Sequence, residues 1–148
     1  MTAPGVPGGT FPAISGVRFV MSDNGRVAFP STVIGASGPN GIWSQEGPGL
    51  ALMCLQGQIA PVSPPGLWNP ASDTPLAMSP NGRVAFNTLF AVGNGNYSAL
   101  FYGVPSGTLL CARTELDLSK PGFTSFGTPD FNNNFNYGVG ANYRNSDG

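Results

Sequence analysis

Short apolar clusters alternate along the chain with Gly, Pro, Asn and Ser, and this pattern predicts many short strands joined by tight turns. Two stretches each carry four such clusters, in which apolar and polar positions alternate as they do in strands. The predicted strands fall at 17–21, 26–33, 42–45 and 51–56, and again at 74–78, 83–92, 99–103 and 108–113. Because no helical periodicity extends beyond one turn, the sequence predicts an all-β protein.

The two stretches are copies of one repeat. The nonapeptide at 21–29, MSDNGRVAF, recurs 57 residues later at 78–86 as MSPNGRVAF. At the same spacing Phe11 corresponds to Trp68, and Cys54 to Cys111. A worn third copy at 135–142 aligns with 79–86. Such repetition at a long, fixed period is typical of arrays of similar structural units.

Within each copy, Asn-Gly stands between the first two predicted strands, as Asn24-Gly25 and Asn81-Gly82. Both residue types tolerate positive φ, so we expect type I′ hairpin turns there. The segment at 57–73 is rich in proline, which cannot donate to a strand ladder, so we expect a crossover there and no strand. The single domain 1–148 then divides into a connector (1–13), repeat 1 (14–56), a Pro-rich connector (57–73), repeat 2 (74–113), and a connector with a partial repeat 3 (114–148).

A repeated four-stranded antiparallel unit of this length is typical of a propeller-type blade, so we expect two complete blades and one partial blade. The alternative is an open β-solenoid, whose repeats are usually shorter. Alternation predicts an apolar core between the units that contains Val27, Phe29, Trp43, Leu52, Val84, Phe86, Phe101 and Leu110.

A partial third unit leaves an unpaired strand edge, which proteins avoid. Either the chain is a piece of a longer protein, or the third unit caps itself, or neighbouring chains complete one another by strand addition. In this interpretation the segment 2–11 has no partner in its own chain. The residues expected at the assembly contact are therefore Thr2, Phe11, Ala141 and Tyr143.

The composition narrows the classes of function. Only 9% of the residues are charged, the net charge is −1 and the six basic residues are scattered, so we expect no nucleic-acid partner. No apolar run approaches the 18 or more residues of a membrane span, so we expect no transmembrane segment.

The chain contains no His, which excludes Ser/His/Asp catalysis and His-containing metal sites. Asp130, Asn132 and Asn134 resemble the start of a calcium loop, but Phe135 and Ala141 stand where that loop needs Gly and Glu, so a polar loop is favoured. Glu115 and Asp117 share one strand face, and such a pair of carboxylates could act in acid/base catalysis, but a solvated strand end is favoured. We therefore expect no cofactor and no enzymatic activity.

The two cysteines at equivalent repeat positions, Cys54 and Cys111, fall on outer strands of different units. Adjacent outer strands diverge, so the distance between the two Cα atoms should exceed the ~7 Å limit for a disulfide. We expect two small buried apolar side chains; the alternative is a bridge between subunits.

The repeat resembles the bacterial "choice-of-anchor" tandem repeat, whose core reads Asn-x-x-Gly-x-x-Ala-Phe. The matching segments are 22–29, 79–86 and, in degraded form, 135–142, with 41–61 resembling the second half of that repeat. The resemblance covers nearly the whole chain, although Ser stands where the leading Asn is expected. It implies an exported protein of the bacterial cell surface or extracellular space and implies no activity.

We therefore expect an extracellular structural protein that self-assembles into a homo-oligomer or polymer, such as a filament or surface-layer subunit. The alternative is a ligand- or carbohydrate-binding propeller fragment of a larger exported surface protein. In that case the loops at 35–41 and 93–97 and the aromatic residues Trp68, Tyr97 and Tyr102 would contact a sugar or a surface partner.

Overall fold

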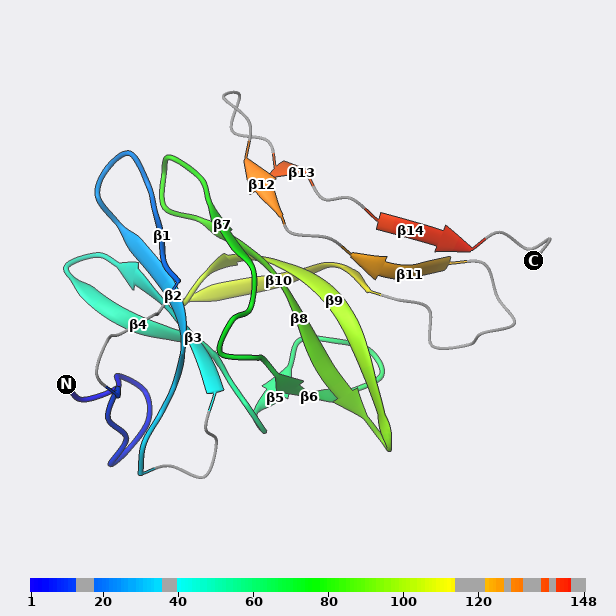
Figure 1. Cartoon of the computed structure of the whole chain (residues 1–148), viewed down its shortest axis with the longest axis horizontal. Coiled ribbons are helices and arrows are strands. Elements are labelled where there is room, and N and C mark those ends of the chain that lie inside the picture. Colours follow the sequence, from blue (N-terminus) through cyan, green and yellow to red (C-terminus); the bar gives the residue numbers. More distant parts are fainter. Residues whose placement is uncertain are drawn as a thin grey trace.

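The computed structural model describes residues 1–12, 18–35, 40–113, 122–126, 129–131, 137–138 and 141–144. Within these residues the chain forms strands and turns with no helix, and every strand pair is antiparallel (Figure 1). The expectation of an all-β fold is confirmed for this part of the chain.

The first sheet is a meander with the strand order β1-β2-β3-β4. Its strands are β1 (Val20–Met21), β2 (Val27–Thr32), β3 (Asn40–Glu46) and β4 (Gly49–Leu55). They coincide, to within a few residues, with the four strands that alternation predicts in the first copy. A two-residue turn, Gly47-Pro48, joins β3 to β4, because Glu46 pairs with Gly49.

The second sheet repeats this meander and extends it. Its main strands are β7 (Leu76–Met78), β8 (Val84–Val92), β9 (Gly95–Val104) and β10 (Gly107–Arg113). The strand order is β10-β9-β8-β6-β5, with β7 also paired to β8. The long strands β8 and β9 are visibly curved along their length (Figure 1).

The Pro-rich connector contains two strands of the second sheet, which corrects the expectation of a strandless crossover. Strand β5 (Ile59–Ala60) pairs with β6 (Gly66–Asn69), and β6 pairs with β8 through Leu67 opposite Ala91. The prolines fall between β5 and β6 or just after β6, where no ladder donor is needed. The high proline content of this segment therefore led to the wrong expectation that it contains no strand.

The N-terminal segment adopts the same arrangement against the first sheet. Thr2 bridges Thr10, and Thr10 bridges Ile34, 57 residues before the equivalent pairs Ile59–Leu67 and Leu67–Ala91. The expectation that 2–11 has no partner in its own chain is therefore wrong. Thr2 and Phe11, assigned to an assembly contact on that premise, belong to the fold of the first unit, and each of the first two units starts with its own short hairpin.

The hairpin between the first two strands of each unit is centred one residue earlier than predicted. The Gly25 N–H donates to the carbonyl of Ser22 at 2.9 Å, and the Gly82 N–H donates to the carbonyl of Ser79 at 2.9 Å. The central residues are thus 23–24 and 80–81, and the glycine that follows has a φ of +78° or +86°. A three-residue connection with glycine in the left-handed region replaces the expected type I′ turn.

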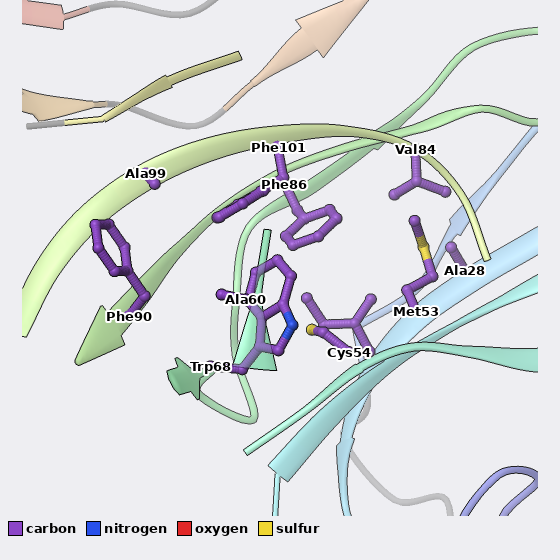
Figure 2. Packing of buried hydrophobic residues seen from close by; sticks show 11 residues of the cluster. Ala28, Met53, Cys54, Ala60, Trp68, Val84, Phe86, Phe90, Ala99 and Phe101 are labelled. Carbon is purple, nitrogen blue, oxygen red and sulfur yellow. The ribbon is translucent and has the colours of Figure 1, made fainter. Parts of the chain in front are cut away.

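A shared apolar core joins the two sheets (Figure 2). Val84, Phe86 and Phe101 of the second sheet lie in it, as expected. The first sheet, however, contributes the side chains that alternate with the predicted ones, Ala28, Ile42, Met53 and Cys54.

The predicted core positions Val27, Phe29, Trp43 and Leu52 do not belong to this shared core. Phe29, Trp43 and Leu52 pack against the N-terminal segment, and Val27 lines a groove beside it. The two sheets have the same orientation in the stack. The face that carries Phe29 in the first sheet and Phe86 in the second can therefore meet the other sheet in only one of them. The side chain of Leu110 lies outside the described residues.

The third unit contributes two short strand pairs. β11 (Gly122–Phe126) pairs with β14 (Ala141–Arg144), and β12 (Asp130–Phe131) pairs with β13 (Tyr137–Gly138). Ala141 lies opposite Phe126, and Tyr143 lies opposite Phe123. These two predicted assembly residues are therefore paired within the chain along one side of β14.

Candidate functional site

Each of the first two units contains an aromatic triad built from its N-terminal hairpin and its second and third strands. In the first unit the ring centroids of Phe11, Phe29 and Trp43 lie 4.8–6.3 Å apart. In the second unit the equivalent rings of Trp68, Phe86 and Phe101 lie 4.3–5.9 Å apart. The repeat in sequence is therefore a repeat in packing.

The first triad also has a polar tie. The indole Nε1 of Trp43 donates a hydrogen bond to the carbonyl of Pro4 at 3.0 Å, and Trp43 is fully buried. Ala3 and Val6 lie in the same cluster as the triad, so the N-terminal segment covers one end of this face. Phe11, predicted at an assembly contact, serves here as a core residue of its own unit.

The two triads differ in what covers them. The second triad faces the first sheet, whose Ala28, Ile42 and Cys54 belong to the same buried cluster. Figure 2 shows Ala28 and Cys54 on the side of the core that the first sheet forms. Val84 and Phe86 have 0% exposure. The equivalent residues of the first unit, Val27 and Phe29, are only half-buried. In the described part of the chain no sheet lies on this side of the first unit.

The edge strand β1 shows the same contrast. Phe19 and Met21 are 66% and 63% exposed. Their equivalents in the second unit, Leu76 and Met78, pack against the shared core. Val20, which alternates with them, packs against that core from the first sheet, so Phe19 and Met21 must point to the opposite side.

We call this side of the first sheet, formed by Phe19, Met21, Val27, Phe29 and Leu50, the open face. It contains a groove of about 400 Å³. None of the lining side chains is charged, and only two of them are polar. The lining consists of Met1, Phe11, Pro12, Phe19, Val27, Phe29, Ser31, Gln45 and Leu50.

Two polar contacts fix how one unit lies on the next. The guanidinium Nη1 of Arg26 donates to the carbonyl of Asn81 at 3.4 Å, which joins the first hairpins of the two units. The carboxylate of Glu46 accepts hydrogen bonds from the N–H and hydroxyl of Ser106, which joins their second hairpins. Equivalent turns therefore lie at the same end of both sheets.

The residues considered for cation binding do not form a described site. Asp130 belongs to β12, whereas Asn132 and Asn134 lie outside the described residues. Glu115 and Asp117, considered for acid/base chemistry, also lie outside them. Among the residues that the structure describes, no group of three His, Cys, Asp or Glu side chains could hold a metal ion.

Cys54 carries a free thiol, 1% exposed, within the shared core. The expectation of a small buried apolar side chain that forms no disulfide is confirmed for Cys54. Burial raises the pKa of the Cys54 thiol far above its usual range, and a hydrogen bond with the backbone of Ile42 opposes this shift only in part. The thiol is therefore neutral and inert in the folded protein.

Strand register shows that the two cysteines are not structural equivalents. Trp43 pairs with Leu52 and Ile42 with Cys54, so Met53 is the extra residue of a bulge. In the second unit Phe101 pairs with Leu110 and Leu100 with Ala112, so the extra residue is Cys111. The same bulge recurs, and it aligns Cys111 with Met53 because the second unit is longer by one residue.

The aromatic residues considered for sugar stacking are engaged in packing. Trp68 is 4% exposed in the second triad, the Tyr97 ring lies 6.0 Å from that of Phe90, and the Arg83 guanidinium lies over the Tyr102 ring at 5.7 Å. The predicted loop at 93–97 is a tight hairpin, because Val92 pairs with Gly95.

A polar hollow of about 300 Å³ contains no aromatic side chain. It is lined by Arg18, Ala71, Asp73, Thr74, Pro75, Asn87, Thr88, Leu89 and Ser98.

Sequence reasoning missed the open face. It placed Val27 and Phe29 at the interface between the units, but only their repeat equivalents, Val84 and Phe86, lie there. The match of Ala3-Pro4 and Phe11 to Ala60-Pro61 and Trp68 was the signal that could have revealed it, because it places a complete hairpin in front of each unit.

None of the described residues forms a helix that could carry the chain across a lipid bilayer. No curated protein and no solved structure matches the chain. One family model matches residues 1–146, nearly the whole sequence, and its description assigns no activity. The chain therefore belongs to the family of unknown function DUF7453.

Proposed function

We propose that this protein is an extracellular structural subunit that self-assembles, each chain being completed by its neighbours. The observation that carries the proposal is the open face. The same face of the second unit has a sheet stacked on it, whereas none of the described residues forms a sheet on this face of the first unit. A repeat that buries one face in one unit and exposes it in the next lacks one neighbour.

The energetics favour covering the open face. Full burial of a Phe or Met side chain contributes about 1.5–3 kcal/mol. Phe19 and Met21 are largely exposed, and Val27 and Phe29 are half-buried beside them. No lining side chain of the groove is charged, so its burial would carry no cost of desolvating a charged side chain.

We also propose that the units are propeller-type blades. In support, each of the first two units contains a four-stranded antiparallel meander. Their first strands, β1 and β7, approach one another, and equivalent turns lie at the same end of both sheets. Two complete units are too few to close a ring of four to eight blades. Further units from neighbouring chains would continue the array.

Export to the cell surface or extracellular space is part of this proposal. It is supported by the resemblance to the choice-of-anchor repeat and by the low content of charged residues, 9%, which leaves little repulsion between stacked chains. The alternative function, carbohydrate binding, has weaker support, since Trp68 is buried in a triad and the polar hollow offers no ring for stacking.

The test is the mass of the full chain in solution. Sedimentation velocity and light scattering over a concentration series should show species heavier than one chain, and the heavier fraction should grow with concentration. Negative-stain images of that fraction should show extended or closed particles of repeating units. A single species with the mass of one chain at the highest concentration would falsify the proposal.

A further inference from the structure

Asn-Gly pairs are chemically labile, because glycine has no side chain to keep its nitrogen away from the amide carbon of the preceding asparagine. The glycine nitrogen can attack that carbon and displace ammonia once the local structure opens enough for the two atoms to meet. The packing around each glycine therefore decides which pair reacts in the folded protein. The chain contains four such pairs, Asn24-Gly25, Asn40-Gly41, Asn81-Gly82 and Asn94-Gly95.

Aromatic side chains cover the glycine in two of these pairs. A Cβ on Gly41 would lie 2.6 Å from the Trp43 ring, and Gly41 is also held in the ladder between β2 and β4. A Cβ on Gly95 would lie 2.6 Å from the Tyr97 hydroxyl oxygen. In both places a packed side chain must move before the backbone of the pair can rotate.

The other two pairs stand in the equivalent first hairpins of the two units and differ in their cover. Gly82 is buried beneath Arg26 of the preceding unit, whose Cδ would lie 2.6 Å from a Cβ on that glycine. The Nη1 of the same arginine donates to the carbonyl of Asn81 at 3.4 Å. Gly25 is exposed, and no described atom beyond its chain neighbours lies within 4 Å of the corresponding position.

We propose that Asn24 is a site of spontaneous deamidation in the folded protein, and that packing protects the other three asparagines. The Gly25 N–H donates to the Ser22 carbonyl at 2.9 Å, so its nitrogen reacts only when this turn opens. Opening is easiest here because no side chain of the described residues covers the glycine. The inference does not depend on the proposed function.

The reaction uses only water as a co-reactant. The Gly25 nitrogen gives up its proton and bonds to Cγ of Asn24, while the Cγ–Nδ2 bond breaks and Nδ2 takes up a proton and leaves as ammonia. A water molecule then opens the cyclic imide, adding hydroxyl to one carbonyl carbon and hydrogen to the nitrogen. The product is aspartate or isoaspartate, which places a second negative charge beside Asp23.

Tandem mass spectrometry after incubation at pH 8 follows all four pairs in one sample. The protein is kept dilute, so that contacts between chains do not cover Asn24. Asn24 should lose its amide roughly tenfold faster than Asn40, Asn81 or Asn94, because each of these must first break a covering contact. In urea the four rates should converge, because the folded packing is then lost.

Removal of the covering arginine tests the cause of the protection. Arg26→Ala should speed the deamidation of Asn81 by roughly fivefold and leave that of Asn40 and Asn94 unchanged. Arg83→Ala is the matched control, since Arg83 follows Asn81 in sequence as Arg26 follows Asn24 and does not cover Gly82. This control should leave the rate at Asn81 as it is, and both variants should keep the circular dichroism of the wild type.

Hydrogen exchange of the two glycines gives a second readout. Both N–H groups donate to a serine carbonyl at 2.9 Å, yet the Gly25 N–H should exchange faster than that of Gly82. If Asn24 reacts no faster than Asn81 in the folded chain, or reacts only in urea, the inference is overturned. The mass of the chain in solution, which tests the proposed function, has no bearing on this outcome.

Discussion

The carboxylate of Glu46 accepts a hydrogen bond from the N–H of Ser106 at 2.9 Å and another from its hydroxyl at 2.5 Å. These two residues belong to the second hairpins of successive units, so the contact spans the interface between them. Because the contact is exposed, we expect Glu46→Ala to lower the free energy of unfolding by only about 1 kcal/mol in urea titrations. Glu46→Gln, which keeps an acceptor, should lose less.

A double-mutant cycle provides the control for this contact. Ser106→Ala removes the hydroxyl and keeps the backbone donor, so the cost of Glu46→Ala should shrink in that background without vanishing. Costs that are strictly additive would show that the hydroxyl does not interact with Glu46.

Ser79 anchors the first hairpin of the second unit. It is 1% exposed, its hydroxyl donates to the Asn81 side chain, and it accepts a hydrogen bond from the Arg83 N–H at 3.0 Å. Ser79→Ala leaves that N–H without its partner and should cost about 1–2 kcal/mol in urea unfolding. Ser22→Ala should behave alike, since the Arg26 N–H donates to Ser22 Oγ at 3.1 Å.

The same comparison of turns predicts a stabilising change. Pro80 stands in the second turn where exposed Asp23 stands in the first. Proline fits the first central position of a type I turn and restricts the unfolded chain, so Asp23→Pro should raise the free energy of unfolding by about 0.5 kcal/mol. A loss of 1 kcal/mol or more in this variant would show that the two turns are not equivalent.

Ser44 lies fully buried on β3, and among the described residues its Oγ has no hydrogen-bond partner. Burial of an unpaired hydroxyl is unfavourable. Ser44→Ala should therefore leave stability unchanged or raise it by about 1 kcal/mol, measured by thermal and urea unfolding. Ser79→Ala is the contrasting control, and a similar loss in both variants would contradict this account.

Burial of the Cys54 thiol predicts that the free energy of unfolding depends on pH. Burial raises the pKa of its thiol in the folded chain, whereas the unfolded chain ionises near the ordinary value of about 8.5. The contribution of this group to stability is present below that value and is lost as pH rises above it, by at most about 1.4 kcal/mol per pH unit. Urea unfolding from pH 7 to 10 in a Cys111→Ser background should show the fall, and Cys54→Ala should reduce it.

Thiol labelling tests the same burial independently. In the Cys111→Ser chain, a thiol reagent should react with Cys54 only on unfolding, so labelling should follow the unfolding curve. Rapid labelling of the folded chain at pH 7 would be incompatible with a buried, neutral thiol.

The meanders could be predicted from sequence because local rules determine them. Alternation and turn residues located β1–β4 and β7–β10 to within a few residues. The short hairpins were missed for a local reason as well, since Pro61 and Pro64 suggested a crossover although both lie between strands.

The choice of face could not be predicted. Alternation assigns Phe29 and Phe86 to equivalent faces, and this is correct. It does not tell which face of a unit meets its neighbour, because both faces of the first sheet are apolar, with Ala28 and Ile42 on one side and Phe29 on the other. Only the stacking in three dimensions distinguishes an interface from the open face.

The contact between Glu46 and Ser106 uses two side chains that the first two units do not share. Strand register makes Val104 the equivalent of Glu46, so the hairpin of the second unit has no carboxylate at this position. It makes Pro48 the equivalent of Ser106, so the hairpin of the first unit has neither an N–H nor a hydroxyl there. This one asymmetric pair of side chains therefore distinguishes the first unit, which supplies the carboxylate, from the second unit, which supplies the donors. The order of the two units is thus built into their contact, although most of the repeated sequence does not distinguish one unit from the other.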